Sequence, residues 1–241
     1  MIPRLRLFAG PNGSGKSSLQ TVLERKFLGE VINPDELENT LRKNQSLNLS
    51  DFGCNVKDTD IRHFLNESTL LKKSGLNNQI NQLGFEGHIV NFDNVDINSY
   101  WAAVFSDFIR RQWIKQKKSF SFESVMSSSD KIEFLKLAKS YGYRTYLYFI
   151  ATSDPELNIS RVKSRVATGG HDVPEDKIRD RYYRSIGLMK EAIKVCDRSY
   201  IFDNSGSSHV WLAEVTSGKN VEIKEDKLPD WFVESFDEIK A

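Results

Sequence analysis

The sequence predicts an α/β fold in which a parallel sheet carries helices on both faces. Residues 4–28 read as a strand, a glycine-rich loop and an amphipathic helix. Further strand-like runs then alternate with helical segments as far as residue 206. Strands separated by helices favour parallel pairing. Residues 207–241 differ, and we expect them to form a hairpin and a closing helix packed on the same domain, which spans residues 1–206.

The segment 30–43 continues the alternation after the first helix. It reads as a short second strand, a turn at Pro34 and a helix opened by Asp35 and Glu36. Carboxylates are favourable in the first turn of a helix, because the N-terminus carries partial positive charge. The second strand therefore ends just before Asp35.

Residues 44–98 have a different composition, with ten Asn in this stretch and several glycines. Asn and Gly disfavour long regular elements. We therefore expect a mostly helical or irregular insertion with one or two short helices. The best helical pattern in it runs from Asp60 to Lys73.

After the insertion, apolar residues recur every three or four positions from Tyr100 to Lys118, which predicts a long helix with one buried face. The remaining elements can be listed in order. They are a strand over 119–125, a helix ending near Gly142, a strand over 143–152, a helix over 154–168, a loop over 169–174, a helix over 175–195, and a strand over 198–206. The hairpin and the closing helix follow.

Composition and charge exclude several classes of protein. With 241 residues, 39% apolar and 28% charged, the chain lies in the globular range. A net charge of +1 provides no overall field that would gather nucleic acid or a membrane surface. Cys54 and Cys196 have no spacing that suits a disulfide framework or a zinc site. Since Met1 leads directly into a strand and no apolar stretch approaches about 18 residues, we expect a cytoplasmic protein without membrane contact.

The loop after the first strand carries the complete phosphate-binding pattern, a glycine, four residues, and then Gly-Lys-Ser. Its residues are Gly10, Pro11, Asn12, Gly13, Ser14, Gly15, Lys16, Ser17 and Ser18. In such a loop backbone N–H groups surround an anion, the lysine reaches the β- and γ-phosphates, and the serine hydroxyl can ligate Mg²⁺. The motif lies between a strand and a helix, as it requires, so it predicts nucleotide binding in a P-loop NTPase-type sheet. The alternative is a plain glycine turn.

Two carboxylates follow strands of the same predicted sheet. Asp35 comes after the second strand and Glu123 ends the third. The carboxyl ends of parallel strands open onto one crevice, where a carboxylate can accept the proton of an attacking hydroxyl. Asp35 can equally serve only as a helix cap, and Glu123 as a solvated charge at a strand end. Together they suit a polyhydroxylated acceptor better than a polyanion.

The arginine segment, residues 160–185, surrounds the loop TGGHDVP. It contains Arg161, Arg165, Arg179, Arg181 and Arg184. Guanidinium groups on a glycine-hinged flap suit phosphoryl transfer, because charge spreads over the transferring oxygens and water must be excluded. The alternative is a solvated helix face whose arginines pair with nearby carboxylates. His171, in the loop, is either a phosphate contact or an ordinary loop residue.

Five motifs in a fixed order resemble the zeta toxin family of P-loop kinases. They are FAGPNGSGKSSL, INPDE, FSFESVMS, RVKSRVATGGHDVPEDKIRDRYYRSI and DNSG, and the resemblance covers about residues 1–42 and 100–206. The GGHxVP loop places the chain nearest a shorter branch of that family, similar to UDP-N-acetylglucosamine kinases. Known members phosphorylate that nucleotide sugar with ATP or GTP and Mg²⁺, which starves cell-wall synthesis.

The resemblance implies roles for particular residues. Lys16 and Ser17 would contact the phosphates and the metal. Asp35 would be the general base, and Glu123 an acceptor or metal-shell residue. Arg161 or Arg165 would clamp the γ-phosphate.

The sequence departs from this pattern in two places. His171 stands where the sugar-nucleotide kinases have a second clamping arginine, so Arg181 or Arg184 would have to supply that charge. The insertion 44–98 has no counterpart that we recognise, and it follows the helix that Asp35 opens. Kinase chemistry is thus implied more strongly than the acceptor.

Three functions fit the sequence. The first is an ATP- or GTP-dependent kinase of a small hydroxylated acceptor, with a nucleotide sugar suspected. The second is a polynucleotide kinase, although the nearly neutral insertion offers no basic track for nucleic acid. The third is a nucleotide-binding regulatory module without catalysis. No antitoxin-like helical segment precedes the first strand, so we expect any antitoxin to be a separate protein.

Overall fold

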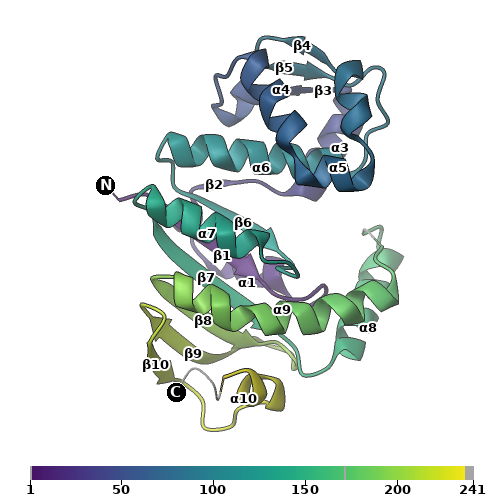
Figure 1. The fold of residues 1–241 in the computed structure, drawn as a ribbon. Helices are drawn as coiled ribbons and strands as arrows, with labels where there is room; N and C mark the ends of the chain where they lie inside the picture. Colours follow the sequence, from purple (N-terminus) through teal and green to yellow (C-terminus); the bar gives the residue numbers. More distant parts are fainter. Residues whose placement is uncertain (1, 171, 237–241) are drawn as a thin grey trace. The chain divides into compact units, whose positions relative to one another are not determined.

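The structure is a computed structural model that describes residues 2–170 and 172–236, with the side chain of Phe236 excepted. The chain divides into two compact units (Figure 1). The first unit comprises residues 1–30 and 119–241, and the second comprises residues 31–118. The chain therefore leaves the first unit once and returns to it once.

A seven-stranded sheet forms the centre of the first unit. Its strands are β1 (Arg4–Ala9), β2 (Glu30–Val31), β6 (Phe120–Ser124), β7 (Arg144–Ala151), β8 (Arg198–Asp203), β9 (Val210–Thr216) and β10 (Asn220–Ile223), in the spatial order β10-β9-β8-β7-β1-β6-β2. β1 runs parallel to β6 and to β7, and β7 runs parallel to β8. β9 and β10 are antiparallel additions at the edge. The predicted α/β class is confirmed.

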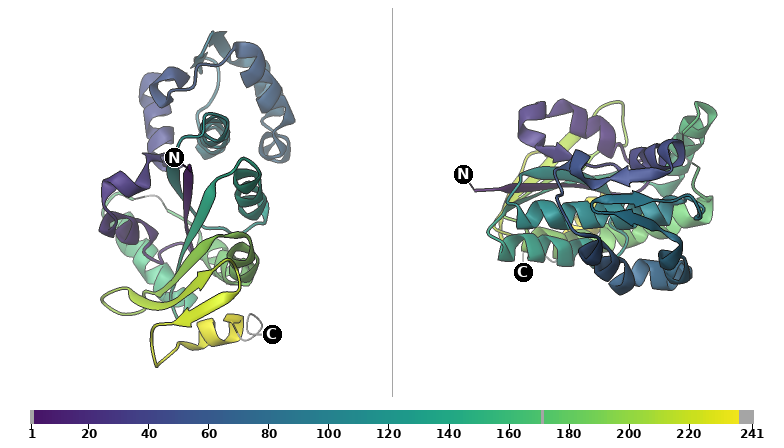
Figure 2. Two further views of the ribbon diagram at one scale, coloured as in Figure 1. Left: turned by 90° about the vertical axis from the view of Figure 1, so that its left-hand side faces the viewer. Right: turned by 90° about the horizontal axis from the view of Figure 1, so that it is seen from above.

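Helices lie on both faces of this sheet. They are α1 (Lys16–Val22), α2 (Arg25–Leu28), α7 (Asp130–Ser140), α8 (Pro155–Ala167), α9 (Glu175–Val195) and α10 (Asp230–Phe236). Figure 2 shows α7 and α9 on one face and α1 on the other. Leu5, Leu7 and Leu147 of the central strands are fully buried, as strands covered on both sides require.

The predicted helix over 16–28 is interrupted in the structure. Leu23 and Glu24 adopt extended backbone between α1 and α2. The break lets α2 bury Leu28 and bring Gly29 against the segment just before β6. A Cβ atom on Gly29 would lie 2.2 Å from the Ser119 carbonyl oxygen there. Tertiary packing at Gly29 thus outweighs the helical pattern.

The second unit contains more regular structure than its composition predicts. Its elements are α3 (Pro34–Asn44), β3 (Ser46–Asn48), η1 (Leu49–Phe52), α4 (Asp58–Glu67), α5 (Thr69–Ser74), η2 (Asn77–Gln82), β4 (Gly84–Glu86), β5 (Ile89–Asn91) and α6 (Ser99–Lys115). The three strands form an antiparallel sheet in the order β3-β5-β4. The helix predicted over 60–73 is two helices, because Ser68 ends α4 and its hydroxyl caps α5 by accepting from the Leu71 N–H.

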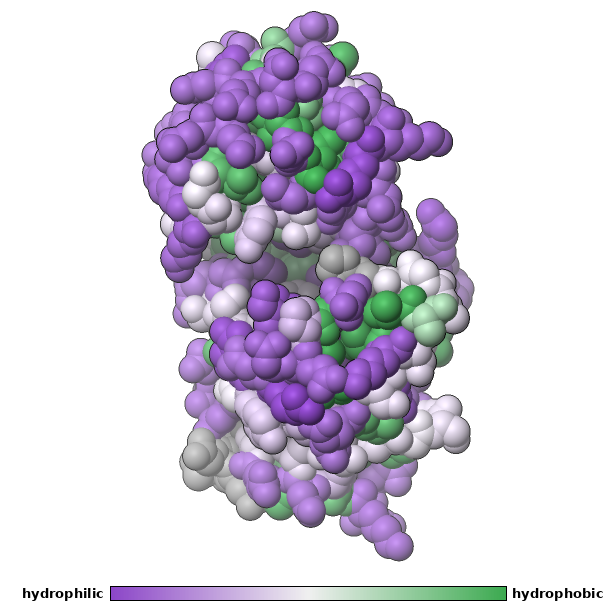
Figure 3. Space-filling view, turned by 90° about the vertical axis from the view of Figure 1, so that its right-hand side faces the viewer, coloured by the Kyte–Doolittle hydropathy of each residue, from purple (hydrophilic) through white to green (hydrophobic). Residues whose placement is uncertain are grey.

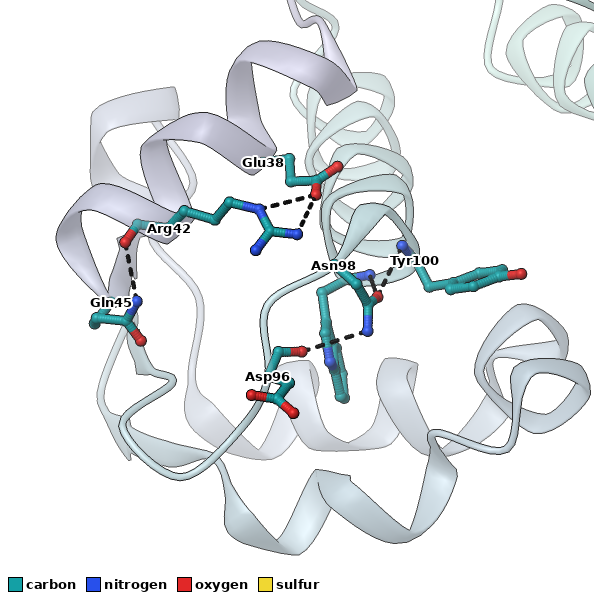
Figure 4. Close-up of polar contacts among 7 residues, drawn as sticks. Glu38, Arg42, Gln45, Asp96, Asn98 and Tyr100 are labelled. Carbon is teal, nitrogen blue, oxygen red and sulfur yellow. Dashed lines mark hydrogen bonds and ion pairs between the residues drawn. The ribbon is translucent and has the colours of Figure 1, made fainter. Parts of the chain in front are cut away.

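The asparagines of this unit cap helices rather than prevent them. Asn33, Asn48 and Asn98 accept backbone N–H groups at the starts of α3, η1 and α6. Figure 4 shows Asn98 accepting from the first turn of α6, with Arg42 donating to Glu38 on α3 nearby. Two of the asparagines of residues 44–98, Asn48 and Asn98, therefore fix the starts of regular elements.

Candidate active site

The phosphate-binding loop joins β1 to α1 and is tightly enclosed. Gly10, Gly13 and Gly15 all have positive φ, at 143°, 73° and 95°. A Cβ atom on them would lie 1.9 Å from the Ile150 carbonyl oxygen, 2.6 Å from the Asn158 carbonyl oxygen, and 2.2 Å from Asn204 Nδ2, respectively. No side chain fits at these positions, so β7, α8 and the residue after β8 together fix the shape of the loop.

Two asparagine side chains hold the carbonyl groups of the loop. Asn158 Nδ2 donates to the Asn12 carbonyl oxygen at 2.6 Å, and Asn204 Nδ2 donates to the Ser14 carbonyl oxygen at 2.8 Å. The Thr152 hydroxyl donates in turn to the side chain of Asn158. Because these carbonyls are engaged by amide donors, the loop is prepared to present its N–H groups to an anion.

Lys16 lies across the loop that precedes it. Its Nζ donates to the carbonyl oxygens of Gly10 and Pro11, both at 2.8 Å. Loss of hydration lowers the pKa of Lys16 to about 8; the negative charge of Glu123 opposes this shift, and the positive charge of Arg165 adds to it. The free protein therefore keeps a poorly hydrated cation at the point where a phosphate would be held.

The loop fits a phosphate group by its chemistry as well as by its shape. The Ser14 hydroxyl is fully buried and has no hydrogen-bond partner among the described residues. A buried hydroxyl without a partner is unfavourable, and an anion in the loop would accept its hydrogen. Ser14, Lys16 and the start of α1 thus form a donor set typical of phosphate sites.

Ser17, in the first turn of α1, lies beside Glu123 near the end of β6. The Ser17 hydroxyl donates to Glu123 Oε2 at 3.0 Å, because β1 and β6 pair in parallel with Phe8 opposite Glu123. A hydroxyl oxygen and a carboxylate oxygen are ligands that Mg²⁺ prefers, with phosphate oxygens and water completing the shell. These two residues would hold the metal of a nucleotide complex.

The arginines of the arginine segment differ in their surroundings. Arg179 pairs with Glu156 at 2.6 Å and with Glu175 at 3.3 Å, and Arg184 pairs with Asp180. Arg179 and Arg184 thus belong to a helix face whose arginines pair with nearby carboxylates, which was the alternative to a phosphate clamp.

Arg161, Arg165 and Arg181 have other environments. Arg161 donates to the carbonyl oxygens of Asn204 at 2.7 Å and Gly206 at 3.3 Å, so it holds the loop after β8. Arg165 is exposed, and its charge acts on Lys16. Arg181 is partly buried on α9. His171 lies outside the described residues.

An apolar pocket of about 320 Å³ lies between α8 and α9, beside the TGGHDVP loop. It is lined by Ile159, Val162, Lys163, Val166, Asp172, Val173, Pro174, Glu175 and Ile178. Figure 3 faces the end of the molecule where α8 and α9 meet, and shows apolar surface there.

Asp35 belongs to the second unit, in the first turn of α3. Its backbone N–H donates to Asn33 Oδ1 at 2.9 Å, so Asn33 and not Asp35 is the N-cap. The Asp35 carboxylate is on an exposed residue and is not used as a cap. Its role as the general base stays a prediction.

Asn158, Asn204 and His209 were not found by sequence reasoning. His209 Nε2 lies 3.2 Å from the Ser18 hydroxyl and 3.4 Å from the Gly15 carbonyl oxygen. In the sequence, Asn204 was marked by its place in the DNSG motif, whereas nothing in the sequence indicated a role for Asn158 in the phosphate-binding loop. Contacts between segments 146 and 190 residues apart leave no local pattern.

Comparison with known proteins finds one matching family, one relative in sequence and several similar folds. Residues 99–216 match the zeta toxin family. An uncharacterized protein of Haemophilus influenzae is 39% identical over 69 residues, which are 29% of this chain and 49% of that protein. The match thus spans about half the length of that relative. In the described residues, no helix combines the length and the apolar character needed to span a membrane.

Two solved assemblies have similar folds. AvrRxo1-ORF1 with AvrRxo1-ORF2 and sulphate gives a TM-score of 0.55 at 15% identity, over 92% of this chain and 61% of that chain, and the same pair with ATP gives 0.54 at 16%. The PezAT toxin–antitoxin system of Streptococcus pneumoniae gives 0.52 at 14%, over 96% of this chain and 76% of that chain. At these identities the likeness shows the fold alone.

Proposed function

We propose that this protein is a zeta-toxin-like kinase that transfers the γ-phosphate of ATP or GTP to a hydroxyl of a small acceptor. A nucleotide sugar of the UDP-N-acetylglucosamine type is the first candidate acceptor. The observation that carries the proposal is that Lys16 and Ser17, at the start of α1, lie with Glu123 of β6 around the phosphate-binding loop, and that Ser17 donates to Glu123. The family match over 99–216 and a fold neighbour that holds ATP support it.

In this mechanism each residue has a separate task. Lys16 leaves the carbonyls of Gly10 and Pro11 and donates to the phosphates. Ser17 and Glu123 would hold Mg²⁺, which would offset the charge of the phosphate oxygens. Arg165 adds positive charge close to Lys16. Asp35 accepts the proton of the acceptor hydroxyl.

The arrangement also assigns different roles to two arginines that the resemblance treats alike. We propose Arg165 as the γ-phosphate clamp, since its charge acts on Lys16. Arg161 instead keeps the loop after β8 in place, because its guanidinium group donates to two carbonyl oxygens of that loop. Arg181 lies on α9, in the same segment, and we propose it as an additional contact for a phosphate group.

The partner of such a kinase would be a separate antitoxin. The AvrRxo1 structure contains a second protein, and PezAT is described as a toxin–antitoxin system. By analogy we propose that an antitoxin protein binds this chain, that both act in the cytoplasm, and that neither membrane nor nucleic acid is a partner.

One experiment tests the reaction. Purified protein is incubated with γ-labelled ATP or GTP, Mg²⁺ and a panel of sugar nucleotides, free sugars and oligonucleotides, and labelled products are separated. We expect a labelled sugar nucleotide with the wild-type protein and none with Lys16→Ala or Asp35→Asn. Asp35→Asn should still bind ADP as tightly as the wild type. A labelled oligonucleotide would support the polynucleotide kinase, and absence of any product would support the regulatory module.

A further inference from the structure

Asp203 is a buried carboxylate at the end of β8, and it is 9% exposed. Three donors satisfy it. Trp231 Nε1 donates to Oδ2 at 2.8 Å, and the backbone N–H and hydroxyl of Ser205 donate to Oδ1 and Oδ2, both at 2.9 Å. A buried carboxylate is stable only with such donors. Asp203 therefore ties α10 to the loop that follows β8.

That loop is fixed at further points. Ser205 Oγ accepts the backbone N–H of Ser153 at 2.8 Å, and the Asn204 N–H donates to the Ala151 carbonyl oxygen at 2.8 Å. Between these anchors, the side chain of Asn204 reaches Ser14 in the phosphate-binding loop. A chain of hydrogen bonds and covalent links thus runs from the indole of Trp231 to the Ser14 carbonyl.

Trp231 is held in its position by packing as well. It is 6% exposed, and its ring lies 6.4 Å from Phe149 of β7 and 5.9 Å from Phe232, between ring centroids. A phenylalanine would keep most of this apolar contact but would lose the indole N–H. The hydrogen bond to Asp203 can therefore be removed separately from the packing.

We propose that Trp231 and Asp203 are positioning residues for nucleotide binding, so that the C-terminal helix α10 sets the conformation of the phosphate-binding loop through Asn204. This inference rests on the proposed function insofar as the loop binds a nucleotide. It gives α10, which lies far from Lys16 in sequence, a defined influence on affinity.

The test measures the dissociation constant for ADP by calorimetry, with Mg²⁺, and the thermal unfolding of the free protein. We expect Trp231→Phe and Asn204→Ala each to raise the Kd about tenfold, which corresponds to about 1.4 kcal/mol. The double variant should bind no more weakly than Asn204→Ala, since both changes act through the same side chain. The matched control is Trp211→Phe, because Trp211 Nε1 donates only to the Ala213 carbonyl within β9, and its Kd should equal that of the wild type.

Three results would overturn the inference while leaving the proposed function intact. They are an unchanged Kd in Trp231→Phe with only a lower unfolding temperature, additive effects in the double variant, and an equal loss in Trp211→Phe. Wild-type protein that binds no ADP would overturn both proposals. If Trp231→Phe does not fold, Asp203→Asn removes the negative charge at nearly the same volume and carries the same expectations.

Discussion

Lys16 shows how a single residue combines a cost in stability with a gain in binding. Its two hydrogen bonds go to backbone carbonyls, which are weaker partners than a carboxylate or phosphate. The lowered pKa records that the charged form is disfavoured in the free protein. Binding of a phosphate would favour the charged form again.

Replacing Lys16 by methionine should therefore stabilise the free protein. A group whose folded pKa is about 8 and whose ordinary value is 10.5 destabilises the fold fully below pH 8. The penalty, of the order of 3 kcal/mol, disappears as pH rises from 8 to 10.5. Chemical denaturation should show Lys16→Met more stable than the wild type at pH 7, with the difference shrinking towards pH 10. A difference that does not depend on pH would contradict this assignment of the pKa.

Nucleotide affinity should follow the same titration. Below pH 8 Lys16 is already protonated, so binding takes up little proton there. Between pH 8 and 9 binding should take up a proton, and affinity should fall as pH increases. Calorimetry in two buffers of different ionisation enthalpy measures that uptake directly. Equal heats in both buffers at pH 8.5 would show that Lys16 does not change its protonation.

Glu123 allows a test of the proposed metal site. In Glu123→Gln the neutral amide keeps the volume and can still meet the Ser17 hydroxyl, but it is a weaker ligand for Mg²⁺. We expect the gain in ADP affinity on adding Mg²⁺ to be largely lost, while affinity in EDTA stays close to that of the wild type. Titrations with and without EDTA provide the comparison. If Mg²⁺ increased the ADP affinity of Glu123→Gln as much as that of the wild type, Glu123 would not be a ligand of the metal.

At the scale of elements, the arginine segment contains arginines with different surroundings. Arg179 has two carboxylate partners, whereas the charge of Arg165 acts on Lys16. Arg165→Ala should lower kcat by about 1,000-fold or more, in the range known for clamping arginines, with little change in the Kd for ADP. Arg179→Ala is the matched control and should keep kcat. Single-turnover transfer assays decide, and similar losses in both variants would count against Arg165 as the clamp.

Element prediction succeeded where one local signal decided the structure. Strands β1, β6, β7 and β8 fall within or very near their predicted ranges, because continuous apolar runs are required in a buried parallel sheet. The small sheet of β3, β4 and β5 was missed, since each strand has three residues and alternation cannot be recognised over so few. The break at Leu23 was missed because its cause lies at Gly29 and Ser119.

For the whole molecule, the two crossings between the units lie side by side. The Glu30 N–H donates to the Ser119 carbonyl oxygen at 2.9 Å, so the first unit is nearly continuous without residues 31–118. A linker of about four glycine and serine residues in their place would suffice to close the chain.

This shortened chain should fold and bind nucleotide but transfer no phosphate. Every described contact of the phosphate-binding loop comes from the first unit, whereas Asp35 is removed with the second. We expect the Kd for ADP to stay within about threefold of the wild-type value, a difference of less than 1 kcal/mol. Calorimetry and the labelled-product assay measure the two properties. Nucleotide binding that disappears with residues 31–118 would show that the donor site needs both units.

How much of the candidate site could be predicted also depends on sequence distance. The loop and its lysine follow a short motif and were found at once. The partners Asn158 and Asn204, which fix the loop, come from α8 and from the residue after β8. The spacing of apolar residues along the sequence does not indicate such pairs, because the strand order of the sheet brings them together and not their position in the chain.

The close approach of Asn204 to Gly15 has a consequence for how this sequence can evolve. A methyl group at position 15 would overlap the amide of Asn204, which itself holds the carbonyl next to it. Neither residue can be exchanged alone without either a clash or an unbound carbonyl. Because Gly15 also has a φ of 95°, a smaller residue at 204 would not make room for a side chain there, so positions 15 and 204 should stay glycine and asparagine together among homologues that keep this loop.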